Sequence, residues 1–217
     1  MSYRRYTTCL SLLFIIEWSL LAINPHDRAD WALENVLVLV AVISMVAIHK
    51  SVRLSSVSYT LIFVFLCLHV VGAHYTYSEV PYNQWTIAAG GKGLDELLGW
   101  ERNQFDRIVH FLYGALLVYP FRELFLRLSG ARGFWDYLLP LTVIMSTSMI
   151  FELIEWFAAE LFGGDLGIAY LGTQGDVWDA HKDMALSTIG AVAVIIFVAF
   201  REGRLQQKSA VNRTKGL

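Results

Sequence analysis

The run WALENVLVLVAVISMVAI, residues 31–48, is almost wholly apolar and has no proline or glycine. It is close to the length of about 20 residues that a helix needs to cross the hydrocarbon core of a bilayer. The polar segments 24–30 and 49–56 bound it on both sides. This run therefore predicts a transmembrane helix.

Similar apolar runs recur along the chain and predict an all-α fold. The six predicted transmembrane helices are residues 8–23, 31–48, 57–75, 107–126, 137–162 and 184–200. No polar stretch reaches the length of about 50 residues that a soluble domain needs. We therefore expect one integral membrane domain over residues 1–217, a polytopic bundle of about six helices. In the longest gap, the short segment 94–98 is interpreted as a surface helix.

The composition agrees with a bilayer protein. The chain has 217 residues, of which 56% are hydrophobic and 17% are charged, whereas soluble domains average about 25% charged residues. The net charge of -2 gives no sign of nucleic-acid binding, so membrane lipid is the expected surrounding partner. Cys9 and Cys67 lie in apolar runs without a C-x-x-C pair, which argues against a thiolate zinc site. The start MSYRRY precedes an apolar run with no cleavage-like site, and we interpret it as part of an uncleaved first helix.

The distribution of Lys and Arg predicts that both chain ends lie in the cytoplasm. In the six-helix arrangement one side carries twelve of the 17 basic residues, and the positive-inside rule makes that side cytoplasmic. The five on the other side are Arg28, Lys92, Arg102, Arg107 and Lys182.

In this topology the ionisable residues gather in the outward halves of the helices. Charged groups in a membrane are costly, and they face the bundle interior or water. We therefore predict a polar cavity open to the extracytoplasmic side. The residues concerned are Glu17, His69, His74, Asp106, His110, Glu152, Glu155, Asp176, Asp179 and Asp183.

The spacing of these residues predicts that they converge. Side chains three or four positions apart share one face of a helix. This holds for the pairs Asp106/His110, Glu152/Glu155 and Asp179/Asp183, which are the candidate catalytic residues. Such a set suits a pair of general acid and base groups, and it equally suits a divalent metal. The candidate metal ligands are His110, Glu155, Asp179 and Asp183, and the candidate substrate-binding residues are His74, Arg107, Gln174 and Asp176.

Purely structural roles remain open for each of these residues. Asp176 with Asp179 fits the capped start of a helix, and Asp106 could pair with Arg102 or Arg107. His110 could bond a carbonyl group, and Glu152 and Glu155 could pair with partners inside the bundle. No H-E-x-x-H signature strengthens the case for a metal.

Four blocks of sequence resemble the YjdF-type family of bacterial inner-membrane proteins. They are HVVGAHYTYSEVPY (69–82), RNQFDRIVHFLYG (102–114), ELIEW (152–156) and AYLGTQGDVWDAHKDM (169–184). The resemblance implies a multi-pass protein of the bacterial cytoplasmic (inner) membrane and implies no particular activity.

A shorter pattern is similar to the VanZ-like membrane proteins. They have D-x-x-x-H at the start of one helix, an acidic position in the next, and an Asp-rich segment before a Gly-Ala helix. The matching positions are Asp106 and His110, Glu152 or Glu155, and Asp179 and Asp183 with Gly190 and Ala191. VanZ-like proteins are linked to glycopeptide resistance and the cell envelope, which would suit a site that faces outward.

The sequence leaves three functions open. The first is the binding or processing of an envelope lipid or lipid-linked substrate, with the acidic residues and His110 as acid–base groups or metal ligands. The second is a transporter of a small solute or protons, and here the one-sided distribution of charge counts against a full pathway. The third is a structural or adaptor protein whose polar residues only fix the helix packing.

Overall fold

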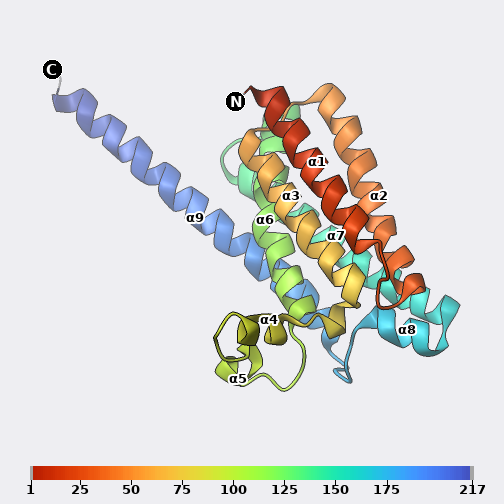
Figure 1. The fold of residues 1–217 in the computed structure, drawn as a ribbon. Helices are drawn as coiled ribbons and strands as arrows, with labels where there is room; N and C mark the ends of the chain where they lie inside the picture. Colours follow the sequence, from red (N-terminus) through yellow and green to blue (C-terminus); the bar gives the residue numbers. More distant parts are fainter. Residues whose placement is uncertain (1, 216–217) are drawn as a thin grey trace.

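The computed structural model describes residues 2–215, with side chains described for residues 2–203, and its regular elements are all helices. Five of them are long and apolar enough to cross a membrane (Figure 1). These are α2 (Arg28–Ser51), α3 (Ser56–Tyr75), α6 (Phe105–Leu128), α7 (Phe134–Phe162) and the part Asp179–Gly203 of α9 (Asp179–Lys215). The predicted all-α polytopic bundle is confirmed.

Helix α1 (Tyr3–Leu21) is the element expected as a sixth crossing. Its 19 residues give a length of about 28 Å, but every 18-residue stretch of it contains Arg4, Arg5 and Glu17, whereas each of the five other spans has an 18-residue stretch with at most two charged residues. It lies alongside α3, and the indole Nε1 of Trp18 donates to Oδ1 of Asn35 in α2 at 2.6 Å. Both chain ends lie at the same end of the bundle, as an even number of crossings requires (Figure 1). The sixth crossing therefore stays a prediction.

Most helices extend beyond their predicted bounds. The last two spans begin at Phe134 and Asp179, where the sequence reasoning put 137 and 184, and α6 begins at Phe105 and not at 107. Acidic residues stabilise a helix N-terminus, and the first turns of α6 and α9 include Asp106 and Asp179, which lie before the predicted bounds.

Several short helices lie at the end of the bundle opposite the chain termini (Figure 1). Helix α5 (Leu94–Leu98) coincides with the predicted surface helix. The 3-10 turn η1 (Tyr77–Glu79), α4 (Tyr82–Ala88) and α8 (Gly164–Leu171) were not predicted, since each is too short to leave a helical pattern.

The closest helix packing joins α6 to α9 through two glycines. A Cβ atom added at Gly114 would lie 1.8 Å from the carbonyl oxygen of Ser187, and one added at Gly190 would lie 2.1 Å from that of Phe111. Small residues let transmembrane helices approach this closely. Gly114 follows His110 by one turn and Ser187 follows Asp183 by one turn, so this contact brings the polar residues of the two helices together.

The buried side chains of the bundle are apolar in its middle and ionisable toward both ends. Midway, the buried side chains of Val118, Ile144 and Ala191 fill the interface of α6, α7 and α9. Toward the chain termini, Arg122 of α6 pairs with Asp136 of α7 at 2.6 Å and with Glu202 of α9 at 3.0 Å. The opposite end holds the acidic residues that the sequence singled out.

Candidate functional site

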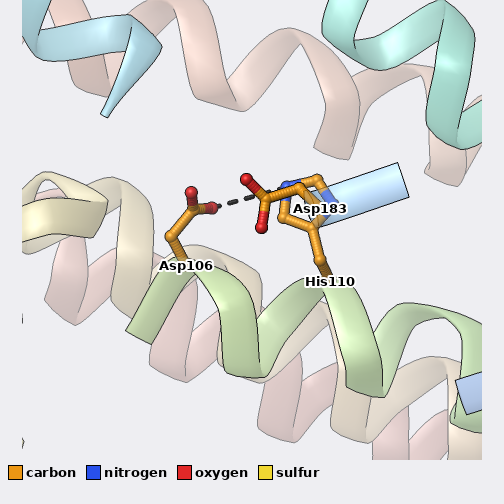
Figure 2. Close-up of side chains that lie close together, drawn as sticks. All are labelled: Asp106, His110 and Asp183. Atoms are coloured by element: carbon orange, nitrogen blue, oxygen red, sulfur yellow. Dashed lines mark ion pairs between the residues drawn. The ribbon is translucent and has the colours of Figure 1, made fainter. Parts of the chain in front are cut away.

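A cluster of three ionisable side chains lies between α6 and α9. Asp106 and His110 extend from the first turns of α6, and Asp183 faces them from the first turns of α9 (Figure 2). One oxygen of each carboxyl group and one imidazole nitrogen all lie within 4.8 Å of one another. Each residue is less than one-tenth exposed, so the cluster is a feature of the bundle interior.

Helix α7 adds the predicted glutamates to this cluster. Nε2 of His110 lies 3.4 Å from Oδ1 of Asp106 and 3.6 Å from Oε1 of Glu152. The side chain of Glu155 is buried beside that of Glu152.

Two serines fix the other edge of the imidazole. The hydroxyl of Ser187 donates to the carbonyl oxygen of His110 at 3.1 Å, and Ser148 in turn donates to Ser187 at 3.1 Å. The hydroxyl oxygen of Ser187 also lies 3.5 Å from Nδ1 of His110. Nδ1 therefore faces the Ser187 hydroxyl, and Nε2 is directed at the carboxyl groups of Asp106 and Glu152.

An ion-paired layer covers the cluster on the side away from the chain termini. Arg102 and Arg107 both pair with Asp179, at 2.9 and 3.1 Å. Both also face Asp176, which Arg107 contacts directly and which accepts from Nζ of Lys182 at 2.5 Å. The Lys182 ammonium group, the Trp178 amide and the Arg107 guanidinium hold the pKa of Asp176 well below its usual range.

The loop that carries Asp176 is fastened over Asp106. The side chain of Gln174 accepts from the amide of Asn103 at 3.1 Å and donates to its carbonyl oxygen at 3.0 Å. Gly172 adopts a left-handed conformation with φ 58, and a Cβ atom there would lie 3.8 Å from Oδ2 of Asp106. Glycine therefore lets the chain reverse direction close to the carboxyl group.

The acid dependence of stability should report on Asp176. Because its folded-state pKa is depressed, its ionised form stabilises the fold above about pH 4, and this contribution is lost as the pH falls through the depressed value. We expect Asp176→Asn to lower the thermal midpoint in detergent by a similar amount from pH 7 to about pH 4, and by less in stronger acid. A difference that grew on acidification would contradict the assignment; Glu96→Gln, an exposed ion-pair residue, is the control.

The structure adds acidic residues of α2 beside His69 that the sequence did not lead us to include in the site. Glu34 is buried, and its Oε2 lies 3.9 Å from Nε2 of His69, whose Nδ1 lies 2.5 Å from the hydroxyl of Tyr77. Asp30, one turn before Glu34, is hydrogen-bonded to Thr76. A signal existed, because Asp30, Glu34 and Val38 are four apart and are the buried residues of α2. The predicted helix began at residue 31, so Asp30 was assigned to the loop before it, and the shared helix face of Asp30 and Glu34 was not recognised.

Not every predicted site residue reaches the cluster. His74 places Nδ1 2.7 Å from the carbonyl oxygen of Leu21, and so it contacts the α1–α2 connection. Of the four predicted metal ligands, His110 and Asp183 belong to the group of three, Asp106 completes it, and Glu155 and Asp179 lie outside it. Arg102 and Arg107 pair with Asp176 and Asp179, while the imidazole faces Asp106.

These features define a multi-pass helical membrane protein with a buried acidic cluster near one end of the bundle. The chain belongs to the family described as "Predicted membrane protein (DUF2238)", whose model matches residues 6–204. It is 34% identical over 194 residues to the "Inner membrane protein YjdF" of Escherichia coli (strain K12), covering 89% of this chain and 88% of that protein. It is thus a protein of the bacterial inner membrane. No solved structure matches it, and the similarity to VanZ-like proteins stays a prediction.

Proposed function

We propose that this protein binds and processes an envelope lipid or lipid-linked substrate whose phosphate-bearing headgroup enters from the outer leaflet. The observation that carries the proposal is the position of the Asp176 carboxylate. Three cationic side chains, Arg102, Arg107 and Lys182, converge on it directly above the buried His110 cluster. The excess of Lys and Arg at the other end of the bundle supports an outward orientation for this layer.

The cationic layer has the chemistry that binds a phosphate group. Guanidinium groups donate in a planar fork that matches phosphate oxygens, and an ammonium group adds a point charge. Among the described residues, the buried Nε groups of Arg102 and Arg107 have no hydrogen-bond acceptor. A headgroup phosphate that displaced Asp176 would meet the same three cations and would have these further donors within the same layer.

The cluster below that layer has the chemistry for proton transfer. His110 can accept or donate a proton at Nε2, and the carboxyl groups of Asp106 and Glu152 flank that atom at 3.4 and 3.6 Å. A histidine held in this way is a common general acid or base. We assign His110 the transfer of a proton at the bound headgroup, with Asp106 and Glu152 orienting the imidazole.

The interior of the bundle favours this function over transport. A solute or proton pathway would continue as polar groups through the inner half of the bundle. In the described part of the chain, Val118, Ile144 and Ala191 instead pack at 0–1% exposure across α6, α7 and α9. The acidic cluster is therefore better suited to a substrate that enters and leaves on one side.

The binding of a phosphate lipid is the direct test. We expect the detergent-purified protein to retain phosphatidic acid in preference to phosphatidylcholine, as measured by native mass spectrometry. Arg107→Gln should weaken this retention about 10-fold or more, because a hydrogen bond to a charged group contributes about 1.5–3 kcal/mol.

Arg28→Gln is the matched control for the loss of an outward positive charge. Arg28 bonds the carbonyl oxygen of Ala22 and lies outside the Asp176 layer, so its loss should leave lipid retention unchanged. Equal retention of the two lipids by the wild type, or an equal loss in both variants, would rule out a phosphate subsite at Arg107.

A further inference from the structure

We infer that Asp106, His110 and Asp183 bind a divalent transition-metal cation of the Zn²⁺ or Mn²⁺ class. The inference deepens the proposed function of the same site and rests on it for the identity of the substrate. With Nε2 of His110 bound to the cation, the proton transfer assigned to that atom passes to Glu152, which lies outside the group of three. Three features support the inference, namely the positions of the ligand atoms, an unpaired buried carboxylate oxygen and the orientation of the imidazole.

The three ligand atoms lie at metal-binding separations. They are all within 4.8 Å of one another and extend from two helices (Figure 2). Gly114 and Gly190 allow these two helices to pack closely. Ligands held about 2.0–2.4 Å from one ion lie at most about 4–4.8 Å apart. Little movement of the side chains would therefore bring all three onto one cation.

Asp183 provides an independent sign that a cation belongs here. Its side chain is only 2% exposed, and among the described residues its Oδ1 has no hydrogen-bond donor. Oε1 of Glu152, which is directed at the same imidazole, also has no donor. A buried carboxylate oxygen without a partner is costly, and a bound cation is one of the few groups that would offset this cost in a bilayer.

The imidazole is oriented as a ligand would be. Nδ1 of His110 lies 3.5 Å from the hydroxyl oxygen of Ser187, which Ser148 holds, and Nε2 is directed toward Asp106 and Glu152. Ligating histidines characteristically bond an oxygen through their other nitrogen, which is the arrangement that Ser187 provides.

The donor set selects the class of metal. Ca²⁺ and Mg²⁺ prefer oxygen ligands alone, whereas one imidazole with carboxylates suits Zn²⁺ or Mn²⁺. Asp106 and Asp183 neutralise the charge of such an ion. A cation at this point would polarise a phosphoryl oxygen of a headgroup held by the Arg102–Arg107 layer, which connects it to the proposed substrate.

Metal binding by the full-length protein tests the inference without a substrate. The chelator-treated protein in detergent is loaded with Zn²⁺ or Mn²⁺ and desalted, and its metal content is measured by elemental mass spectrometry. We expect close to one equivalent in the wild type. Asp183→Asn and His110→Gln should reduce the affinity at least 10-fold in a calorimetric titration, while His26→Gln, an exposed histidine whose side chain pairs with Glu79, should retain it.

Two measurements keep the test decisive if a ligand variant fails to fold. Ser148→Ala removes only the hydroxyl that supports Ser187, and it should weaken metal binding while the protein still folds. Co²⁺ bound to the wild type should give the visible absorption of a nitrogen–oxygen site. The inference is overturned if the wild type binds no Zn²⁺ or Mn²⁺ at millimolar concentration, or if Asp183→Asn and His110→Gln bind as well as His26→Gln.

The same samples separate this inference from the proposed function. Phosphatidic acid retention is measured on chelator-treated and on metal-loaded protein. Metal without lipid retention would leave the cation site in place and remove the phosphate-lipid function, whereas lipid retention without metal would do the reverse.

Discussion

Replacing Gly190 with alanine is expected to destabilise the protein by about 3 kcal/mol, which is roughly a 10 °C fall in the thermal midpoint. The added Cβ atom would lie 2.1 Å from the carbonyl oxygen of Phe111 and 3.0 Å from the amide nitrogen of Ala115. Both are backbone atoms of α6 and cannot rotate away, so α6 and α9 would have to separate. Intrinsic tryptophan fluorescence during heating in detergent measures the change.

Gly203 provides the control on the same helix. A Cβ atom at Gly203 would have no heavy atom within 4 Å, and alanine is the better helix former by about 1 kcal/mol. Gly203→Ala should therefore leave the midpoint unchanged or raise it. If the two variants had equal midpoints, the close approach of α6 and α9 would be incorrect.

The separation of α6 and α9 should also dismantle the acidic cluster. His110 lies one turn before Gly114 on α6, and Asp183 lies one turn before Ser187 on α9. The glycine contact thus fixes the distance between two of the three proposed metal ligands. In Gly190→Ala we expect Zn²⁺ affinity and the thermal midpoint to fall together.

The helices were largely predictable from the sequence because hydropathy is a local property. Runs such as residues 31–48 and 57–75 must be helical to satisfy their backbone groups in lipid, whatever surrounds them. Which helices contact one another depends on shape, and the sequence shows this only weakly. Gly190 and Ala191 were singled out in the sequence through a resemblance. The structure shows that Gly190 packs directly against the backbone of Phe111.

The candidate site was predictable in part, for a related reason. The i, i+4 spacing of Asp106 and His110 placed them on one face, and a charged face in a membrane helix points inward. Glu34 escaped notice because one carboxyl group in a long apolar run barely alters the mean hydropathy. The ion pair between Asp176 and Arg107, 69 residues apart, depends on the loop conformation at Gly172 and Gln174. No local sequence pattern predicts such a contact.

The described part of the chain holds two buried polar clusters of opposite electrostatic design. At one end Arg122 is bonded to Asp136 and Glu202, so its charge is matched. At the other end Asp106, Asp183 and Glu152 face a single imidazole, and one oxygen each of Asp183 and Glu152 has no donor among the described residues, as is also true of Oδ1 of Asp136. The first arrangement stabilises a fold, whereas the second carries a cost that is typical of sites kept for function.

The same substitution in these two clusters should therefore have opposite effects. Asp136→Asn removes the negative charge that faces the buried Arg122 guanidinium at 2.6 Å and should destabilise the protein by about 3 kcal/mol. Asp183→Asn has nearly the same shape and removes one of several mutually repelling carboxyl groups. In chelator, its midpoint should equal or exceed that of the wild type by a few degrees.

Added Zn²⁺ or Mn²⁺ should raise the thermal midpoint of the wild type above that of Asp183→Asn. A ligand that binds only the folded state stabilises it in proportion to its saturation, so the metal should raise the wild-type midpoint and have little effect on Asp183→Asn. Asp136→Asn retains the acidic cluster and should gain as many degrees from the metal as the wild type does. A different result would contradict the metal site. If Asp183→Asn lowered the thermal midpoint in chelator as much as Asp136→Asn does, Asp183 would stabilise the fold without a bound metal.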